Sequence, residues 1–229
     1  MSLKAGEHQV QLELAVAAEM GLGYLDGSWL IPESPQALLV FSHGAGAPYT
    51  HATMQALAAH FAEHELASLR YNFPYMQAGK RRVDAQAVAT QTIAEAVAWA
   101  RDQSQLPTFL AGHSFGGRMN GHAVLEHAID CQGLIFCSYP LHPPRKPGVE
   151  RAARLVEVQQ PKLFLSGTRD DLADQALMNT MVANLPNAQL HWLDTGNHSY
   201  VPLKRTRKHP LTIFQEMAQV AAEFVDAHI

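Results

Sequence analysis

A serine between glycines stands near the middle of the chain, in the run Gly112-His113-Ser114-Phe115-Gly116. Residues 107–111 before it are apolar, as in a short buried strand, and residues 117–127 after it have a helical composition. A Gly-x-Ser-x-Gly pattern between a strand and a helix is typical of a sharp turn that exposes the serine hydroxyl as a nucleophile. The pattern predicts nucleophilic chemistry at Ser114, although ordinary strand-to-helix turns can also carry such a motif.

A nucleophilic serine needs a base to take its proton and a carboxylate to orient that base. Asp170 follows the apolar run 161–167, at the point where a parallel strand would end. His198 lies in a glycine-containing loop after the strand-like residues 189–193. We therefore expect Asp170 as the acid and His198 as the base, because the carboxyl ends of parallel strands gather catalytic groups.

Other residues compete for the role of the acid. Asp171 and Asp174 lie close to Asp170 in the sequence. An aspartate in this turn could also cap a helix that begins near Leu172, and this structural role suits Asp171 best.

Acyl transfer also needs two backbone N–H groups that stabilise a developing oxyanion. The amide of Phe115, directly after the nucleophile, is one candidate. The second is the amide of Ala45, in the glycine-containing loop 42–48 after the apolar strand-like residues 37–41. A glycine-rich loop can also bind phosphate, but the spacing here matches neither G-x-G-x-x-G nor the P-loop pattern.

The order of nucleophile, acid and base along the chain is the order used by α/β-hydrolases. Because of this order, the turn at Ser114 and the strand pattern, the chain resembles members of the α/β-hydrolase superfamily over nearly its full length. Within the superfamily it resembles the small dienelactone-hydrolase-like proteins. The resemblance implies an α/β fold with a mostly parallel twisted sheet and helices on both faces. Dienelactone hydrolases have a cysteine nucleophile where this chain has Ser114, so the resemblance implies general ester chemistry.

The expected mechanism is hydrolysis of a small ester or related acyl bond through an acyl-enzyme that water resolves, with no cofactor. An acyltransferase would use the same residues with a different acceptor. A non-catalytic interaction module would keep the fold and use an exposed apolar patch instead.

Composition agrees with one globular domain over residues 1–229, since the chain is 47% hydrophobic. The formal net charge of -4 provides no general attraction for nucleic acid or for an anionic membrane, so we expect a small-molecule ester or acyl partner. Two cysteines do not make a disulfide framework. Without a signal-peptide core or a long apolar stretch, the expected compartment is the cytoplasm, and the sequence indicates no oligomeric state.

Alternating strand and helix patterns predict a doubly wound sheet after an antiparallel start. The start is a pair of strands near residues 9–16 and 22–31, with a turn at Gly21 and Gly23. The later strands are expected near residues 66–71, 107–112, 133–138, 161–166 and 188–193, in addition to 37–41. Apolar stripes predict helices around residues 54–61, 93–100 and 214–225.

The interval between residues 138 and 162 is short and rich in proline, so the sequence predicts a minimal cap and an open site. Five apolar or aromatic residues near strand ends are expected to line the substrate pocket, with ordinary packing as the alternative: Tyr71, Phe73, Tyr75, Tyr139 and Leu141.

Two other features could bind ligands. The basic runs 80–82 and 204–208 could attract an anionic substrate, with solvated surface charge as the alternative. His60 and His64 are spaced as metal ligands on a helix, but Glu63 does not fit an H-E-x-x-H motif and no third ligand is evident, so no metal is assigned.

Overall fold

The computed structural model describes residues 4–229, in which eight strands form one sheet. Their order across the sheet is β1-β2-β4-β3-β5-β6-β7-β8. The strands are β1 (Gly6–Leu12), β2 (Leu25–Ile31), β3 (Ala37–Ser42), β4 (Leu66–Tyr71), β5 (Thr108–His113), β6 (Gly133–Cys137), β7 (Lys162–Gly167) and β8 (Ala188–Leu193).

The sheet is parallel from β3 to β8, and β2 joins it antiparallel to β4. β1 pairs antiparallel with β2, from Gly6 opposite Ile31 to Leu12 opposite Leu25. The predicted antiparallel start is thus confirmed, but its turn is not a simple hairpin. β1 ends at Leu12, and the short helix α1 (Ala15–Glu19) takes up the last two residues of the predicted strand, Ala15 and Val16. Val16 is buried in this helix instead of pairing in the sheet.

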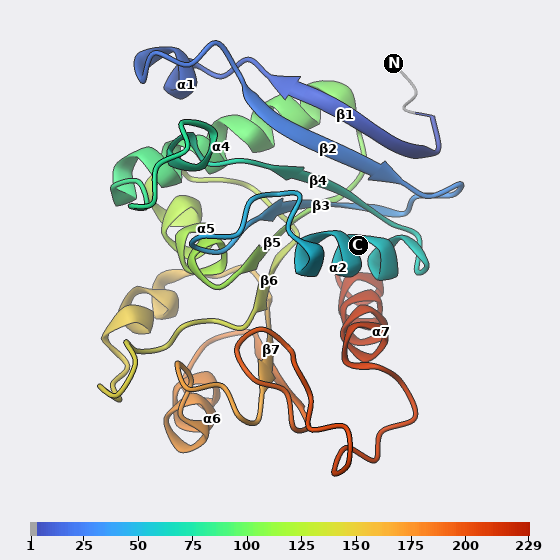
Figure 1. Ribbon diagram of the computed structural model, residues 1–229, viewed down its shortest axis with the longest axis vertical. Helices are drawn as coiled ribbons and strands as arrows, with labels where there is room; N and C mark the ends of the chain where they lie inside the picture. The colour runs from blue at the N-terminus through green and yellow to red at the C-terminus, as the bar shows by residue number, and fades with distance from the viewer. Residues whose placement is uncertain (1–3) are drawn as a thin grey trace.

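Helices cover both faces of the sheet (Figure 1). α2 (Ala52–Ala62) and α7 (Ile213–Asp226) contact each other on one face. α4 (Gln86–Gln103), α5 (Phe115–Glu126) and α6 (Gln175–Ala183) lie on the other, with α1 packed against α4. α3 (Pro74–Gln77) is a single turn after β4, which the sequence pattern did not predict.

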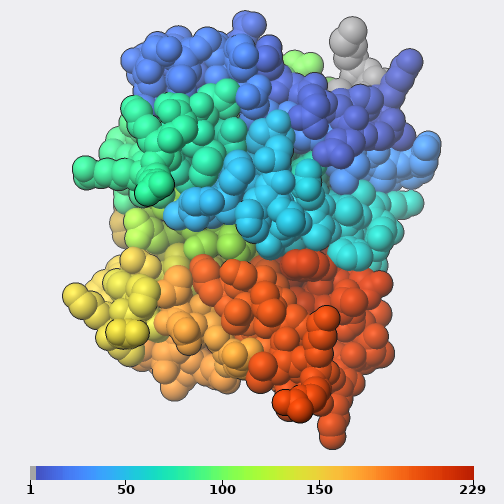
Figure 2. Space-filling model, in the orientation of Figure 1, coloured from blue at the N-terminus to red at the C-terminus, as the bar shows by residue number. Residues whose placement is uncertain are grey.

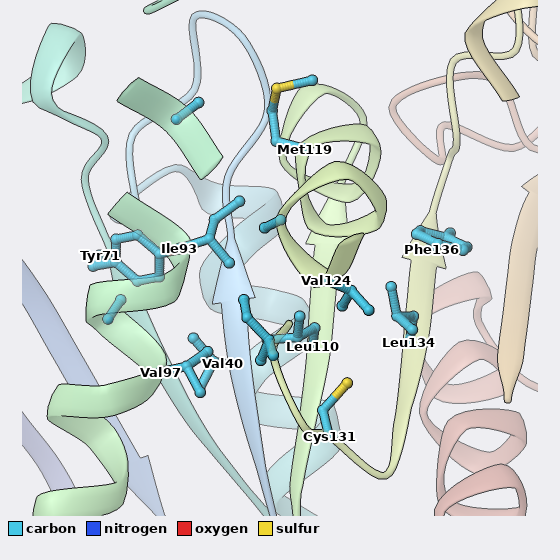
Figure 3. Close-up of a cluster of buried hydrophobic side chains, with 14 of the residues drawn as sticks. Val40, Tyr71, Ile93, Val97, Leu110, Met119, Val124, Cys131, Leu134 and Phe136 are labelled. Carbon is cyan, nitrogen blue, oxygen red and sulfur yellow. The ribbon is translucent and has the colours of Figure 1, made fainter. Parts of the chain in front are cut away.

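The period-two alternation of strand side chains divides the core into two clusters. In β3, Leu38 and Val40 face the α4 and α5 side, while Leu39 and Phe41 face the α2 and α7 side. Figure 3 shows part of the first cluster, where Val40 and Leu110 lie among side chains from α4 and α5. Burial on both faces explains why the central strands are almost continuously apolar.

The connection between β6 and β7 contains one 3₁₀ helix, η1 (Glu150–Glu157), which packs against α5. No other helix occurs in this connection, all of which lies within the described residues. The predicted minimal cap is therefore confirmed. Figure 2 shows this yellow segment at one edge of the molecule, not spread across the visible face.

The parallel strands bring loops distant in sequence to one edge of the sheet. The loops that follow β3, β5, β7 and β8 begin at the carboxyl ends of their strands, where open parallel sheets assemble ligand and catalytic sites.

Candidate active site

Ser114 occupies a strained turn between β5 and α5. Its backbone has φ 49° and ψ -111°, a conformation that a residue with a side chain rarely adopts. The Ser114 amide donates a hydrogen bond to the carbonyl oxygen of Cys137 at 2.9 Å, so the end of β6 holds the turn in place.

The glycines of this turn are required by close backbone packing. A Cβ atom at Gly116 would lie 2.5 Å from the carbonyl oxygen of Ser42, and one at Gly112 would lie 2.4 Å from the amide of Gly117. Real Cβ atoms do not approach other atoms so closely. The glycines that mark the motif in the sequence therefore let β3, β5 and α5 converge around Ser114.

Three side chains from three loops form one hydrogen-bonded chain. Ser114 Oγ lies 2.8 Å from His198 Nε2, and His198 Nδ1 lies 2.8 and 3.0 Å from the two carboxylate oxygens of Asp170. Because a carboxylate accepts at Nδ1, the neutral ring carries its proton there and leaves Nε2 free to accept the proton of the serine hydroxyl.

Burial differs along this chain of hydrogen bonds. The Asp170 side chain is 0% exposed, whereas that of His198 is 25% exposed. One oxygen of Asp170 also accepts the amide of Leu172 at 2.8 Å. The Asp170 carboxylate is thus held in place and shielded from solvent, while the imidazole ring of His198 is partly exposed.

The two alternative acids lie elsewhere. Asp171 is exposed, and Asp174 caps α6 by accepting the amide of Leu177 at 3.0 Å. The predictions that a helix begins near Leu172 and that Asp171 caps it were therefore wrong. Asp170 takes the Leu172 amide within the turn, and the extended conformation of Asp174 delays the helix to Gln175.

The amides of Ala45 and Phe115 have no hydrogen-bond acceptor within residues 4–229. The carbonyl of Gly44, in the same peptide unit as the Ala45 amide, accepts His43 Nδ1 at 2.8 Å, the Ala47 amide at 3.3 Å and the Tyr75 hydroxyl at 3.4 Å. Because the C=O and N–H of a trans peptide point in opposite directions, these bonds turn the Ala45 N–H away from all three donors.

His43 is held neutral by its surroundings. Burial lowers the pKa of its ring to about 4. Its Nε2 accepts the Phe73 amide at 3.0 Å, which leaves the proton on Nδ1 to donate to Gly44. The histidine that precedes the glycine-containing loop therefore orients one peptide of that loop.

His113, the residue before the nucleophile, is also buried and neutral. Burial, and next the neighbouring His198, lower the pKa of His113 to about 4. Its Nε2 lies 3.4 Å from the backbone oxygen of His198, and its Nδ1 would be 2.6 Å from a Cβ at Gly44. His113 thus packs between the glycine loop and the histidine loop.

The five residues predicted to line the pocket are buried in the core cluster, each 1% exposed or less. The Tyr71 hydroxyl lies 2.8 Å from Ser42 Oγ, and the Tyr139 hydroxyl donates to the backbone oxygen of Arg151 at 2.7 Å. Phe73 and Tyr75 contact the ring of Phe115. Tyr71, Phe73, Tyr75, Tyr139 and Leu141 are therefore packed behind the surface, and their contact with a substrate stays a prediction.

Sequence reasoning missed a buried polar bridge behind the nucleophile. Ser42 Oγ donates to Asn120 Oδ1 at 3.0 Å, and Asn120 Nδ2 donates to the carbonyl of Ala111 at 2.9 Å. This bridge ties α5 to β3 and β5. An asparagine on the buried face of a helix was the available signal, because a polar group at such a position needs partners.

The second basic run is not uniformly exposed. The Arg207 side chain is 6% exposed, pairs with the buried Glu216 of α7, and donates to the carbonyls of Asp194 at 2.7 Å and Leu211 at 3.3 Å. Arg207 therefore closes the base of the loop that carries His198. Its partner Glu216 could not be found from spacing alone.

The metal-like spacing of His60 and His64 has no matching geometry. α2 ends before His64, and His60 Nδ1 pairs with Glu63 at 2.9 Å. Across residues 4–229, no three His, Cys, Asp or Glu side chains are grouped as metal ligands.

A protein-family model described as an alpha/beta hydrolase domain matches residues 35–226. The chain belongs to the α/β-hydrolase family. The match includes Ser114, Asp170, His198 and the glycine-containing loop after β3.

Solved structures of α/β-hydrolases have the same fold. Dienelactone hydrolase from Anabaena variabilis is 17% identical with a TM-score of 0.73, covering 99% of this chain and 100% of that one. XC6422 from Xanthomonas campestris, described as a serine hydrolase without a lid, is 18% identical with a TM-score of 0.74, covering 99% and 97%. Est1E from Butyrivibrio proteoclasticus, solved with ferulic acid, is 16% identical with a TM-score of 0.71, covering 90% and 95%.

Among residues 4–229, no helix is long and apolar enough to cross a membrane.

Proposed function

We propose that this α/β-hydrolase cleaves a small ester or related acyl bond with Ser114 as nucleophile. The observation that best supports the proposal is the unbroken chain of hydrogen bonds from Ser114 through His198 to Asp170. Distances of 2.8 Å on both sides of the imidazole suit direct proton transfer at one nitrogen and orientation at the other.

In the first half of the reaction, Ser114 Oγ attacks the acyl carbon while His198 Nε2 takes the hydroxyl proton. The carbonyl oxygen becomes an oxyanion that accepts hydrogen bonds from the Ala45 and Phe115 amides. The bond to the leaving oxygen then breaks, and His198 donates its proton to that oxygen. Asp170 remains ionised and stabilises the imidazolium.

In the second half, water attacks the acyl-enzyme and gives a proton to His198 Nε2. The bond to Ser114 Oγ breaks, the serine recovers the proton, and a carboxylic acid leaves. The same two amides stabilise the second oxyanion, and no cofactor takes part.

The short connection between β6 and β7 supports a small or exposed ester as the substrate. It contains only η1, in a chain whose structural neighbours include a hydrolase described as lidless. Long-chain lipids need an extended apolar cover, for which η1 provides little surface.

Hydrolysis of 4-nitrophenyl esters from acetate to decanoate tests this proposal. We expect kcat/KM to be highest for the short acyl chains, and Ser114→Ala to lower kcat by at least about a thousandfold. Ser199→Ala, which changes an exposed serine beside His198, is the matched control and should retain activity. Wild-type turnover by folded Ser114→Ala would refute the nucleophile, and a preference for decanoate would refute the small substrate.

A further inference from the structure

One continuous segment on the surface is uncharged. Residues 175–193 contain no Asp, Glu, Lys or Arg, although these residue types make up 17% of the chain. The segment forms α6, β8 and the turn between them, and many of its side chains are exposed: Gln175, Ala176, Asn179, Thr180, Ala183, Asn184, Asn187 and Gln189. Because charged residues are depleted at the centre of protein interfaces, this composition is typical of a surface that contacts another protein.

β8 is an edge strand that nothing blocks. It is the last strand of the sheet, beyond β7 at the lower end in Figure 1, and it pairs only with β7. Proteins usually protect an exposed edge with a charged side chain, a proline or a bulge. β8 has neither proline nor a charged Lys, Arg, Asp or Glu, and its register with β7 is unbroken. The opposite edge strand, β1, carries the charged Glu7.

The backbone of β8 presents unused hydrogen-bonding groups at this edge. The Lys162 amide donates to the carbonyl of Asn187 at 2.8 Å, and the Thr168 amide donates to that of Leu193 at 3.1 Å. Backbone groups of alternate residues point to the same side of a strand, so the odd-numbered residues of β8 face β7. The N–H and C=O groups of Ala188, Leu190 and Trp192 therefore point away from the sheet, without a partner among residues 4–229.

The flanking helices leave this edge accessible. On the α7 side, a cavity of about 420 Å³ lies beside β8, and Gln189, Leu190 and His191 contribute to its lining. On the α6 side, the Trp192 indole N–H donates to Asn179 at 3.0 Å, yet Trp192 is still partly exposed. Another strand can therefore reach the backbone of β8.

A second copy of β8 fits this edge in one register. If two copies run antiparallel about a two-fold axis at Leu190, Leu190 lies opposite itself and Ala188 lies opposite Trp192. Each outward residue then exchanges two hydrogen bonds with the residue opposite. The large indole meets the small alanine side chain, and no two like charges face each other.

Other antiparallel registers fit less well. With the axis at Gln189, Trp192 would lie opposite Pro186, which has no N–H to donate. With the axis at His191, Ala188 would lie opposite Asp194, outside the strand. Only the axis at Leu190 uses every outward residue of both strands.

We propose that the protein forms a two-fold dimer in which two β8 strands pair antiparallel about Leu190 and join the two sheets into one. The uncharged outer surface of α6 flanks the paired strands on one face. The dimer is independent of the proposed ester hydrolysis.

Sedimentation equilibrium tests the dimer, with circular dichroism as the folding control. We expect the wild type to have twice the monomer mass of 25.2 kDa. Leu190→Lys and Leu190→Glu should each be monomeric, because like charges would meet on the axis, and an equimolar mixture of the two should dimerise at least about tenfold more tightly than either alone. Gln11→Lys, at an exposed position of β1, is the matched control and should stay dimeric. A wild type that is monomeric at about 200 µM, or a dimer that both Leu190 variants retain, would overturn the proposal.

Cysteine cross-linking tests the register without a charged substitution. Cα atoms in a hydrogen-bonded antiparallel pair lie about 5.5 Å apart, within the range of a disulfide. Oxidised Leu190→Cys should therefore migrate as a covalent dimer on a non-reducing gel. Gln189→Cys is more exposed but lies off the axis, so it should stay monomeric on that gel; the natural Cys131 and Cys137 are buried. Equal cross-linking of the two variants, or none in Leu190→Cys, would overturn the pairing at Leu190.

Discussion

At the scale of single residues, two neutral histidines pack beside the proposed catalytic groups. His43 fixes the peptide that presents the Ala45 amide, and His113 packs between that loop and the loop of His198. Each is buried, and the surroundings lower both pKa values to about 4. Both rings are therefore neutral in the pH range where a histidine base works.

We expect His43→Ala to lower kcat by about tenfold to a hundredfold while KM changes less than about twofold. The Gly44 carbonyl would lose its shortest hydrogen bond, the one from His43 Nδ1. The Ala45 N–H of the same peptide would then no longer be held toward the proposed oxyanion. Steady-state kinetics on a short ester, with circular dichroism as the folding control, measures this. A folded variant with the wild-type kcat would show that His43 does not position the peptide.

The same histidines should make stability depend on pH. Their pKa values fall from 6.5 unfolded to about 4 folded, so between these values the unfolded chain binds more protons. The free energy of unfolding is therefore at its full value above pH 6.5 and decreases as the pH falls toward 4, with a slope of up to about 1.4 kcal/mol per unit for each group.

Urea unfolding at several pH values between 4 and 7 checks this, with His113→Gln as the comparison. The variant should lose roughly half of the acid-dependent slope that the two rings provide. An unchanged slope would mean that His113 is not neutralised on folding.

At the scale of elements, the convergence of β3, β5 and α5 places Ser114. Much of this could be predicted from the sequence: the apolar run before Ser114 became β5, and the runs at 66–71 and 188–193 became β4 and β8. β4 and β5 are buried on both faces and therefore have strong apolar signals, whereas β8 lies at the edge of the sheet and was predicted from its alternation. α1 and α3 were missed because elements of four or five residues show little periodicity. The 3₁₀ helix η1 was also missed.

Gly116→Ala tests the convergence directly. The added methyl would meet the backbone oxygens of Ser42 and His43 at 2.5 and 2.6 Å, so we expect at least about 2 kcal/mol of destabilisation and loss of ester hydrolysis. Gly23→Ala is the matched control, since its Cβ would meet nothing within 4 Å. Equal stability of the two variants in urea would contradict the packing described here.

At the scale of the whole molecule, the topology assembles the site from loops far apart in sequence. The order of Ser114, Asp170 and His198 could be predicted because each follows a segment with a strand pattern, apolar before Ser114 and Asp170 and alternating before His198. The structure holds the three in one hydrogen-bonded chain. The sequence did not allow us to predict the hydrogen bond between Ser42 and Asn120 or the ion pair of Arg207 with Glu216. Their partners meet only after folding, and no local pattern relates them.

The most direct test of Ser114 as an activated nucleophile is covalent labelling of the purified protein with a fluorophosphonate, followed by peptide mass spectrometry. We expect an adduct at Ser114 in the wild type and none in Ser114→Ala, and we expect labelling to be at least about a hundredfold slower in His198→Ala. An adduct elsewhere, or labelling of Ser114 that is equally fast without His198, would contradict an activated serine nucleophile at this site.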